Sequence, residues 1–82
     1  IEFCKTISLK KLDLSYNLIE KIPKEIGNLL NLKILDLNTN KIEEIPTQFG
    51  NLTNLKQLNL DDNKIKKIPI EIGNLVNLEG IG

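Results

Sequence analysis

Short stretches of this chain alternate apolar and polar residues, and the alternation recurs at a fixed interval of 23 residues. Two leucines flank one polar residue in each stretch, which is the period of a strand with one buried face. The stretches are LDL at 12–14, LDL at 35–37 and LNL at 58–60. The blocks around them follow LxxLxLxxNxIxxIPxxIGNLxN without a gap, at 9–31, 32–54 and 55–77, with Phe49 once in place of Ile. Such repetition predicts a solenoid with one coil per block.

The repeat covers nearly the whole chain of 82 residues, so we expect a single domain, 1–82. Residues 1–8 align with the tail of an earlier block, with Phe3 at an apolar position and Cys4 where the other blocks have Gly. Residues 78–82 begin a further block that stops after five residues. Because the first residue is not Met, we interpret the chain as a fragment of a longer repeat protein.

Each block predicts one short strand and one short helical turn. Strands that return in the same direction once per block are parallel, and their leucines point inward. Pro23 fixes φ and lacks an N–H, which suits the start of a helical turn. Gly27 marks the end of that turn, with a left-handed or closely approached backbone. The equivalent residues are Pro46, Pro69, Gly50 and Gly73.

An asparagine follows each predicted strand, at the point where the chain turns into the interior. These residues are Asn17, Asn40 and Asn63. An amide side chain there can pair with the turn backbones of its own and the next coil, and each unpaired buried group would cost about 1–3 kcal/mol. We interpret the three residues as a buried structural ladder in preference to glycan or ligand sites.

The repeat resembles that of the leucine-rich repeat family over nearly the whole chain. The forms IPKEIGNLLNL and IPIEIGNLVNL are similar to the intracellular subgroup that contains Ras-binding scaffold repeats. Plant receptor repeats carry an extra Gly before Ile-Pro, where this chain has Glu20–Lys21. The resemblance implies an α/β fold: a right-handed leucine-rich repeat solenoid with one short parallel strand per repeat on the concave face and short 3-10 or helical turns on the convex side. It also implies a non-enzymatic, cytoplasmic module for scaffolding or signalling that binds protein partners.

Stacked coils bring equivalent residues into columns, and four outward columns form the concave face, the usual binding surface of a solenoid. Tyr16 and Ile34 supply the only sizeable apolar surface on it, as expected for anchors ringed by polar groups. The face changes from Lys10, Lys11 and Lys33 in the first repeats to acidic residues in the last. The predicted partner-binding residues are Tyr16, Ile34, Asp13, Asp36, Lys11, Gln57, Asn59, Asp61 and Asp62. The alternative is ordinary variation at exposed positions.

A second set of columns carries charges of alternating sign. Stacking places Lys21 against Glu44, Glu43 against Lys66, and Glu44 against Lys67. Exposed pairs of this kind contribute about 0.2–1 kcal/mol each. They favour this register over a slipped one, so we interpret them as a solvated structural face.

The composition narrows the function classes. Eleven basic residues balance eleven acidic ones, and every basic residue is lysine, which argues against nucleic acid and against an anionic membrane surface as partners. Without histidine, Cys4 and the hydroxyl groups have no evident base, and Cys4 is expected to be a small buried filler. Asp61–Asn63 lacks the central Gly and distal Glu of a calcium loop. We therefore predict no catalytic, cofactor or metal site, and attribute the sequon at 51–53 to the repeat consensus.

Two alternatives to a free-standing interaction module remain open. The chain can be the docking or targeting segment of a larger enzyme, such as a kinase, GTPase or deadenylase with fused repeats. It can also self-assemble end to end, because terminal repeats normally need a polar cap and neither end has one. The apolar residues at the two ends are Phe3, Leu9, Leu12, Leu75, Leu78 and Ile81.

Overall fold

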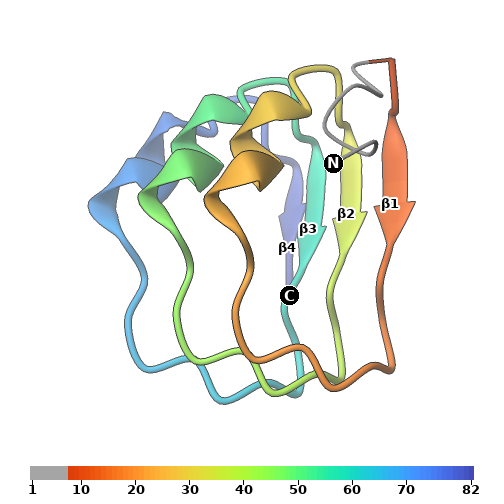
Figure 1. Ribbon diagram of the computed structural model, residues 1–82. Coiled ribbons are helices and arrows are strands. Elements are labelled where there is room, and N and C mark those ends of the chain that lie inside the picture. The colour runs from red at the N-terminus through yellow and green to blue at the C-terminus, as the bar shows by residue number, and fades with distance from the viewer. Residues whose placement is uncertain (1–7) are drawn as a thin grey trace.

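The computed structural model describes residues 8–82, in which short parallel strands alternate with 3-10 helices (Figure 1). The strands are β1 (Lys11–Asp13), β2 (Ile34–Asp36), β3 (Gln57–Asn59) and β4 (Gly80–Ile81). The helices are η2 (Lys24–Asn28), η3 (Thr47–Asn51) and η4 (Ile70–Asn74). This confirms the predicted solenoid with one parallel strand and one short helical turn per repeat. Phe3, Cys4 and most of the partial repeat 1–8 lie outside the described residues.

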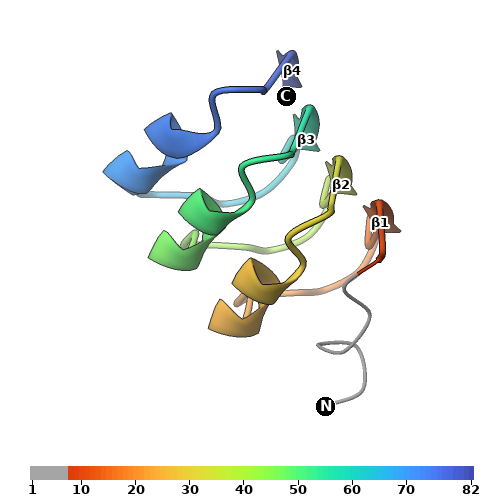
Figure 2. The same cartoon turned by 90° about the horizontal axis from the view of Figure 1, so that it is seen from above.

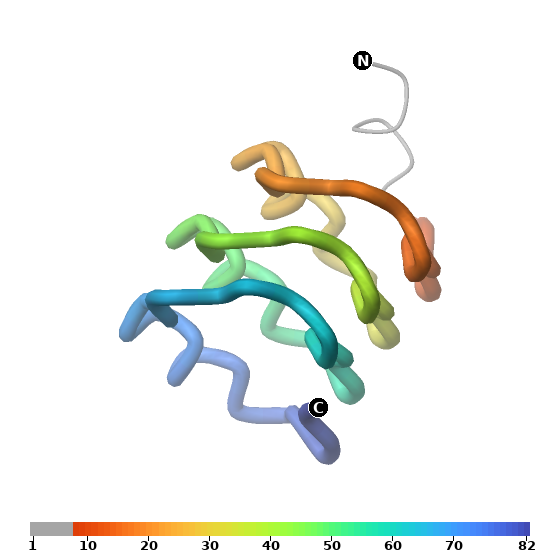
Figure 3. Tube along the Cα trace, turned by 90° about the horizontal axis from the view of Figure 1, so that it is seen from below, coloured from red at the N-terminus to blue at the C-terminus, as the bar shows by residue number. Residues whose placement is uncertain are grey.

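The strands follow one another across the sheet in the order β1-β2-β3-β4. Their register matches the repeat, with Leu12 opposite Leu35 and Leu35 opposite Leu58. The sheet forms one side of the molecule and the 3-10 helices form the other (Figure 2), and the coils lie side by side in chain order (Figure 3). We refer to the solvent side of the sheet as the concave face.

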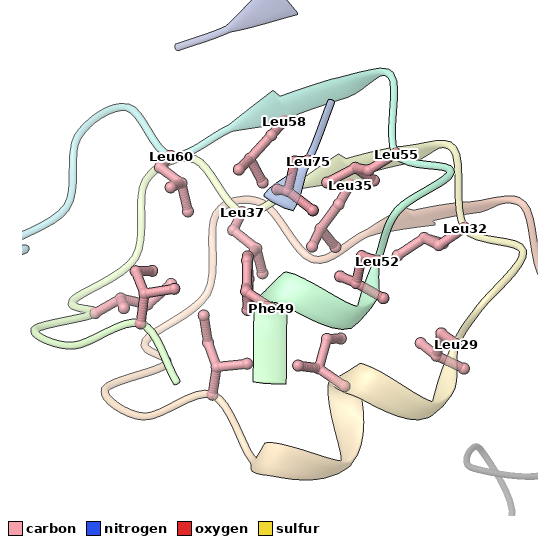
Figure 4. Packing of buried hydrophobic residues seen from close by; sticks show 14 residues of the cluster. Leu29, Leu32, Leu35, Leu37, Phe49, Leu52, Leu55, Leu58, Leu60 and Leu75 are labelled. Carbon is pink, nitrogen blue, oxygen red and sulfur yellow. The ribbon is translucent and has the colours of Figure 1, made fainter. Parts of the chain in front are cut away.

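The core lies between the sheet and the helices (Figure 4). Leu35 and Leu37 point into it from the strand side, and Leu29 and Leu52 fill it from the ends of the helices. Phe49 is fully buried at the position that Ile occupies in the other coils. Burying one such side chain stabilises the fold by about 1.5–3 kcal/mol, so the consensus apolar positions account for the packing of the coils.

The prolines of the repeat fix a backbone angle, whereas its glycines allow neighbouring coils to pack closely. Pro23 has extended backbone angles (φ −67°, ψ 150°) and immediately precedes η2, as its fixed φ predicts. No described glycine has a positive φ, so the left-handed alternative proposed for the glycine column is wrong. Close approach is the reason instead: a Cβ on Gly27 would lie 2.8 Å from the carbonyl oxygen of Gln48. Gly50 stands in the same relation to Glu71, at 3.0 Å.

Among residues 8–82, the left-handed backbone occurs at three non-glycine residues. Tyr16, Thr39 and Asp62 have φ values of 57°, 57° and 56°. Each directly precedes the asparagine of the ladder, where the chain leaves the strand. The turn is therefore built with a conformation that costs an L-residue roughly 1–2 kcal/mol.

The charged columns stack as the sequence predicts. Isolated parallel bridges join Lys21 to Glu44 and Glu44 to Lys67. Lys66 Nζ lies 3.7 Å from Glu43 Oε1, with both side chains more than half exposed. A pair this exposed contributes little to the free energy of unfolding, which agrees with a solvated structural face.

Candidate functional site: the concave face

The concave face consists of the strand side chains that alternate with the buried leucines. Lys11, Ile34 and Gln57 lie side by side in one row, and Asp13, Asp36 and Asn59 form the next row along the strands. Gly80 and Gly82 continue these rows in the last coil without side chains. Six of the nine predicted partner-binding residues therefore share two adjacent rows on one sheet.

The second row has a structural role that the sequence analysis missed. Asp13 Oδ1 accepts hydrogen bonds from the Ser15 amide (3.0 Å) and hydroxyl (2.6 Å). Asp36 Oδ1 accepts them from the Asn38 amide (3.1 Å) and side chain (2.7 Å). Asn59 Oδ1 accepts one from the amide of Asp61 (3.0 Å). These Asx turns end each strand. An Asp or Asn at the last position of a predicted strand is the sequence signal for such a turn.

The same contacts change the acidity of the first carboxyl group. The Ser15 hydroxyl, followed by the Ser15 amide, lowers the pKa of Asp13, since both groups donate to the ionised form. Asp13 is fully exposed, and Lys11 adds a smaller effect in the same direction. The carboxylate at this position is held ionised and in one orientation.

The asparagine ladder forms, but it reaches the preceding coil, not the next one. Asn40 Oδ1 accepts from the Ile19 amide at 3.1 Å, and Asn40 Nδ2 donates to the Leu14 carbonyl at 3.1 Å. Both groups lie beyond the end of β1, and the Leu14 carbonyl also accepts from Asn17 Nδ2 at 2.9 Å. Asn63 makes the equivalent bonds to the coil of β2, to Ile42 and Leu37. Asn40 and Asn63 thus join coils as predicted, but towards the preceding coil. Of the three asparagines only Asn40 is buried, whereas Asn63 is half-buried and Asn17 is exposed, so the predicted burial does not extend to the whole ladder.

A shallow hollow of about 280 Å³ lies on this face beside Ile34. Ile34 is half-buried, and the hollow continues past Asp36, Gln57 and Asn59 to the segment 80–82. Gly80 opens it, because a Cβ there would meet nothing within 4 Å, whereas the side chains of Asp61 and Asn59 approach Gly82 closely. An apolar side chain therefore borders a space that a partner residue can enter.

Tyr16 lies apart from this hollow. It is 77% exposed and stands five residues beyond Lys11, the register partner of Ile34. It lies beyond the Asx turn that ends β1, and it does not line the hollow. Tyr16, with Asp61 and Asp62, belongs to the edge where the strands end, and the structure does not bring it to Ile34.

Charge on the concave face is ordered along the strands more clearly than along the repeats. Lys10, Lys33 and Lys56 stand just before three successive strands, joined through their backbones by the bonds of Lys33 N to Lys10 O and of Lys56 N to Lys33 O. Acidic residues gather where the strands end. They are Asp13, Asp36, Asp61 and Asp62. The predicted change from basic first repeats to an acidic last repeat does not hold for two residues, because Lys56 lies in the third repeat and Asp13 in the first.

The helix side of the described chain is a weaker candidate for the binding site than the concave face. A hollow of about 560 Å³ on the helix side is lined by Lys21, Glu44, Lys67 and the segment 68–71, in which Ile70 is 91% exposed. Its charges alternate in sign and balance. Within residues 8–82, no three metal-ligating side chains come together, and no helix has the length and apolarity needed to cross a membrane.

Comparison with known proteins identifies the repeat. A family model described as leucine-rich repeat region matches residues 2–82, whereas a search of curated proteins gave no match. A solved leucine-rich repeat protein of Leptospira interrogans is 43% identical, with a TM-score of 0.94 over 96% of this chain and 20% of that chain.

Two receptor structures are also similar. The plant peptide hormone receptor RGFR1, in complex with RGF2, is 44% identical, with a TM-score of 0.88 over 99% of this chain and 14% of that one. The ectodomain of the Arabidopsis thaliana receptor kinase GASSHO1/SCHENGEN3, in complex with CASPARIAN STRIP INTEGRITY FACTOR 2, is 34% identical. Its TM-score is 0.83, over 95% of this chain and 10% of that one. The chain thus spans no more than 20% of any of these three solved chains.

Proposed function

Because this chain belongs to the leucine-rich repeat family, we propose that it is a non-enzymatic interaction module that binds a protein partner on its concave face. The hollow beside Ile34 carries the proposal, since it combines an apolar wall with polar side chains of fixed orientation. The complexes of two similar receptors with RGF2 and CASPARIAN STRIP INTEGRITY FACTOR 2 support a protein or peptide as the partner.

We also propose a cytoplasmic location and a scaffolding or signalling role. This rests on the repeat residues alone, because Glu20–Lys21 and their equivalents stand where the plant receptor form has an extra Gly. The alternative, a docking segment of a larger enzyme, uses the same face.

A peptide library tests the binding proposal directly. The chain is immobilised and used to select binders from a phage-displayed random library, and each enriched peptide is then measured against two variants. Ile34→Glu places a charge in the hollow, and Thr47→Glu places the same charge on the exposed start of η3. Both positions tolerate a polar residue, because Gln57 and Lys24 are their counterparts in other coils.

We expect enriched peptides to lose binding to Ile34→Glu and to keep it with Thr47→Glu. Thermal denaturation of both variants checks that neither change unfolds the chain. A library that yields no binder, or binders that tolerate Ile34→Glu, would overturn the proposal.

A further inference from the structure

The concave face carries an ordered sequence of chemistries along the direction of its strands. Lysines come first, at positions 10, 33 and 56, then the apolar Ile34, and then the carboxylates of Asp13 and Asp36. The chain has no net charge, so this order is not visible in its composition. Exposed charges of opposite sign at two edges of one sheet orient a complementary partner.

The two carboxylates are adjacent and held in place. Asp13 and Asp36 are register partners on neighbouring strands, which run about 4.8 Å apart. Oδ1 of each is engaged in its Asx turn, and within residues 8–82 Oδ2 of each has no hydrogen-bond partner. A planar guanidinium group can reach both Oδ2 atoms, since its five donors are arranged in a fork.

The spacing of Ile34 and Asp36 matches an extended peptide. The two residues are i and i+2 on one strand, so their side chains point the same way and stand about 6.6 Å apart along it. Alternate side chains of an extended partner have the same separation. A partner lying along β2 can therefore place one side chain in the hollow and the next one on that face at the carboxylates.

We propose that the partner presents an extended segment of the form acidic-x-apolar-x-basic, read in either chain direction. The apolar residue enters the hollow beside Ile34, and the basic residue pairs with Asp13 and Asp36. The acidic residue faces the lysines at positions 10, 33 and 56, which precede the strands. This inference rests on the proposed function, because it specifies the ligand of the same face.

Labelled peptides test the order of charges by fluorescence anisotropy. The probe is Thr-Glu-Thr-Leu-Thr-Arg-Thr. The first control, Thr-Thr-Glu-Leu-Arg-Thr-Thr, has the same composition but puts the charges on the opposite face from Leu. The second control replaces the Arg of the probe by Glu. We expect the probe to bind roughly 10-fold more tightly than either control, the ratio that a lost charge-assisted contact produces.

The matching protein variant is Asp13→Asn combined with Asp36→Asn. Asn59 shows that an amide at this position keeps the Asx turn, so the change removes charge without removing the turn. We expect it to abolish most of the 10-fold preference for the probe. Glu44→Gln removes an exposed carboxylate from the helix side and should leave the preference unchanged.

Equal binding of probe and controls, absence of binding by all three peptides, or an unchanged preference in the double variant would each overturn the charge order. The proposed function is judged separately. If library peptides still require Ile34 but lack the acidic-x-apolar-x-basic order, the concave face binds a partner of different chemistry and only this inference fails.

Discussion

At the scale of single residues, the Asn40 side chain joins two coils by hydrogen bonds outside the β-sheet. Its side chain pairs with the Ile19 amide and Leu14 carbonyl of the preceding coil and with the Leu37 carbonyl of its own. We expect Asn40→Ala to lower the free energy of unfolding by about 2–4 kcal/mol, because the Ile19 amide loses its acceptor and the Leu14 and Leu37 carbonyls each lose one of two donors. Urea denaturation measures the change. Asn17 is exposed, and within residues 8–82 its hydrogen bonds are to its own coil, so Asn17→Ala should cost less. Equal losses would argue against a role for the bonds between coils.

Asp13 predicts a dependence of stability on acid. Its folded pKa lies below the ordinary value of 3.8 because Ser15 donates to the ionised carboxyl group. A group with a depressed folded pKa contributes stability above its unfolded pKa, and loses that contribution as pH falls through the folded pKa. Urea midpoints measured from pH 6 down to pH 2 should therefore fall less steeply for Asp13→Asn. NMR titration should show the Asp13 pKa rising in Ser15→Ala, and an unchanged pKa there would contradict the assigned cause.

Thr39 predicts a stabilising substitution. It has a left-handed backbone (φ 57°) although its side chain is β-branched, and its hydroxyl donates to Asn38 Oδ1 at 2.8 Å. Asn tolerates this conformation far better, so Thr39→Asn should raise the free energy of unfolding by about 0.5–1 kcal/mol. Asp62→Asn exchanges two tolerant residues at the equivalent position and should change it little. A loss of stability in Thr39→Asn would show that the Thr39 hydroxyl bond outweighs the backbone strain.

At the scale of elements, the glycines set how closely the 3-10 helices stack. A Cβ on Gly27 would meet the backbone and Cβ of Gln48 at 2.8 and 2.9 Å, whereas one on Gly73 meets nothing within 4 Å. Gly27→Ala should thus cost about 1–3 kcal/mol, because η2 and η3 must separate. Gly73→Ala should be neutral or slightly stabilising, since it only restricts the unfolded chain. Similar thermal denaturation midpoints for both variants would mean that the helices separate without cost.

At the scale of the whole molecule, the 23-residue register was enough to predict the sheet, the core and the stacked columns. The register identifies the residues that are neighbours in successive coils, and it correctly predicted that Lys21 lies beside Glu44. It contains no information on the sign of φ or on the direction in which a side chain reaches. For that reason the sequence left two alternatives open for the glycines, gave no sign of the left-handed backbone at Thr39, and led to the wrong coil for the amide of Asn40. The pattern also does not distinguish the Asx turn of Asp36 from a binding carboxylate, because an outward acid at the end of a strand fits both.

The last coil allows the predicted self-association to be tested with two isoleucines two residues apart. Ile68 is 51% exposed, whereas its counterparts Ile22 and Ile45, each covered by a following coil, are 8% and 5% exposed. Ile70 is also exposed, but its counterparts Lys24 and Thr47 remain exposed beneath a following coil. Of these two residues, Ile68 alone belongs to the face on which another coil packs.

We expect the isolated 82-residue chain to associate through this face as its concentration rises, because burying apolar surface favours contact by about 25 cal/mol per Å². Ile68→Lys should shift association to higher concentration in sedimentation-velocity experiments, and Ile70→Lys should not. If both variants shift it equally, exposed apolar surface of any kind drives the association, and the stacking of uncapped coils is not its cause. A chain that stays monomeric at every concentration would exclude end-to-end assembly.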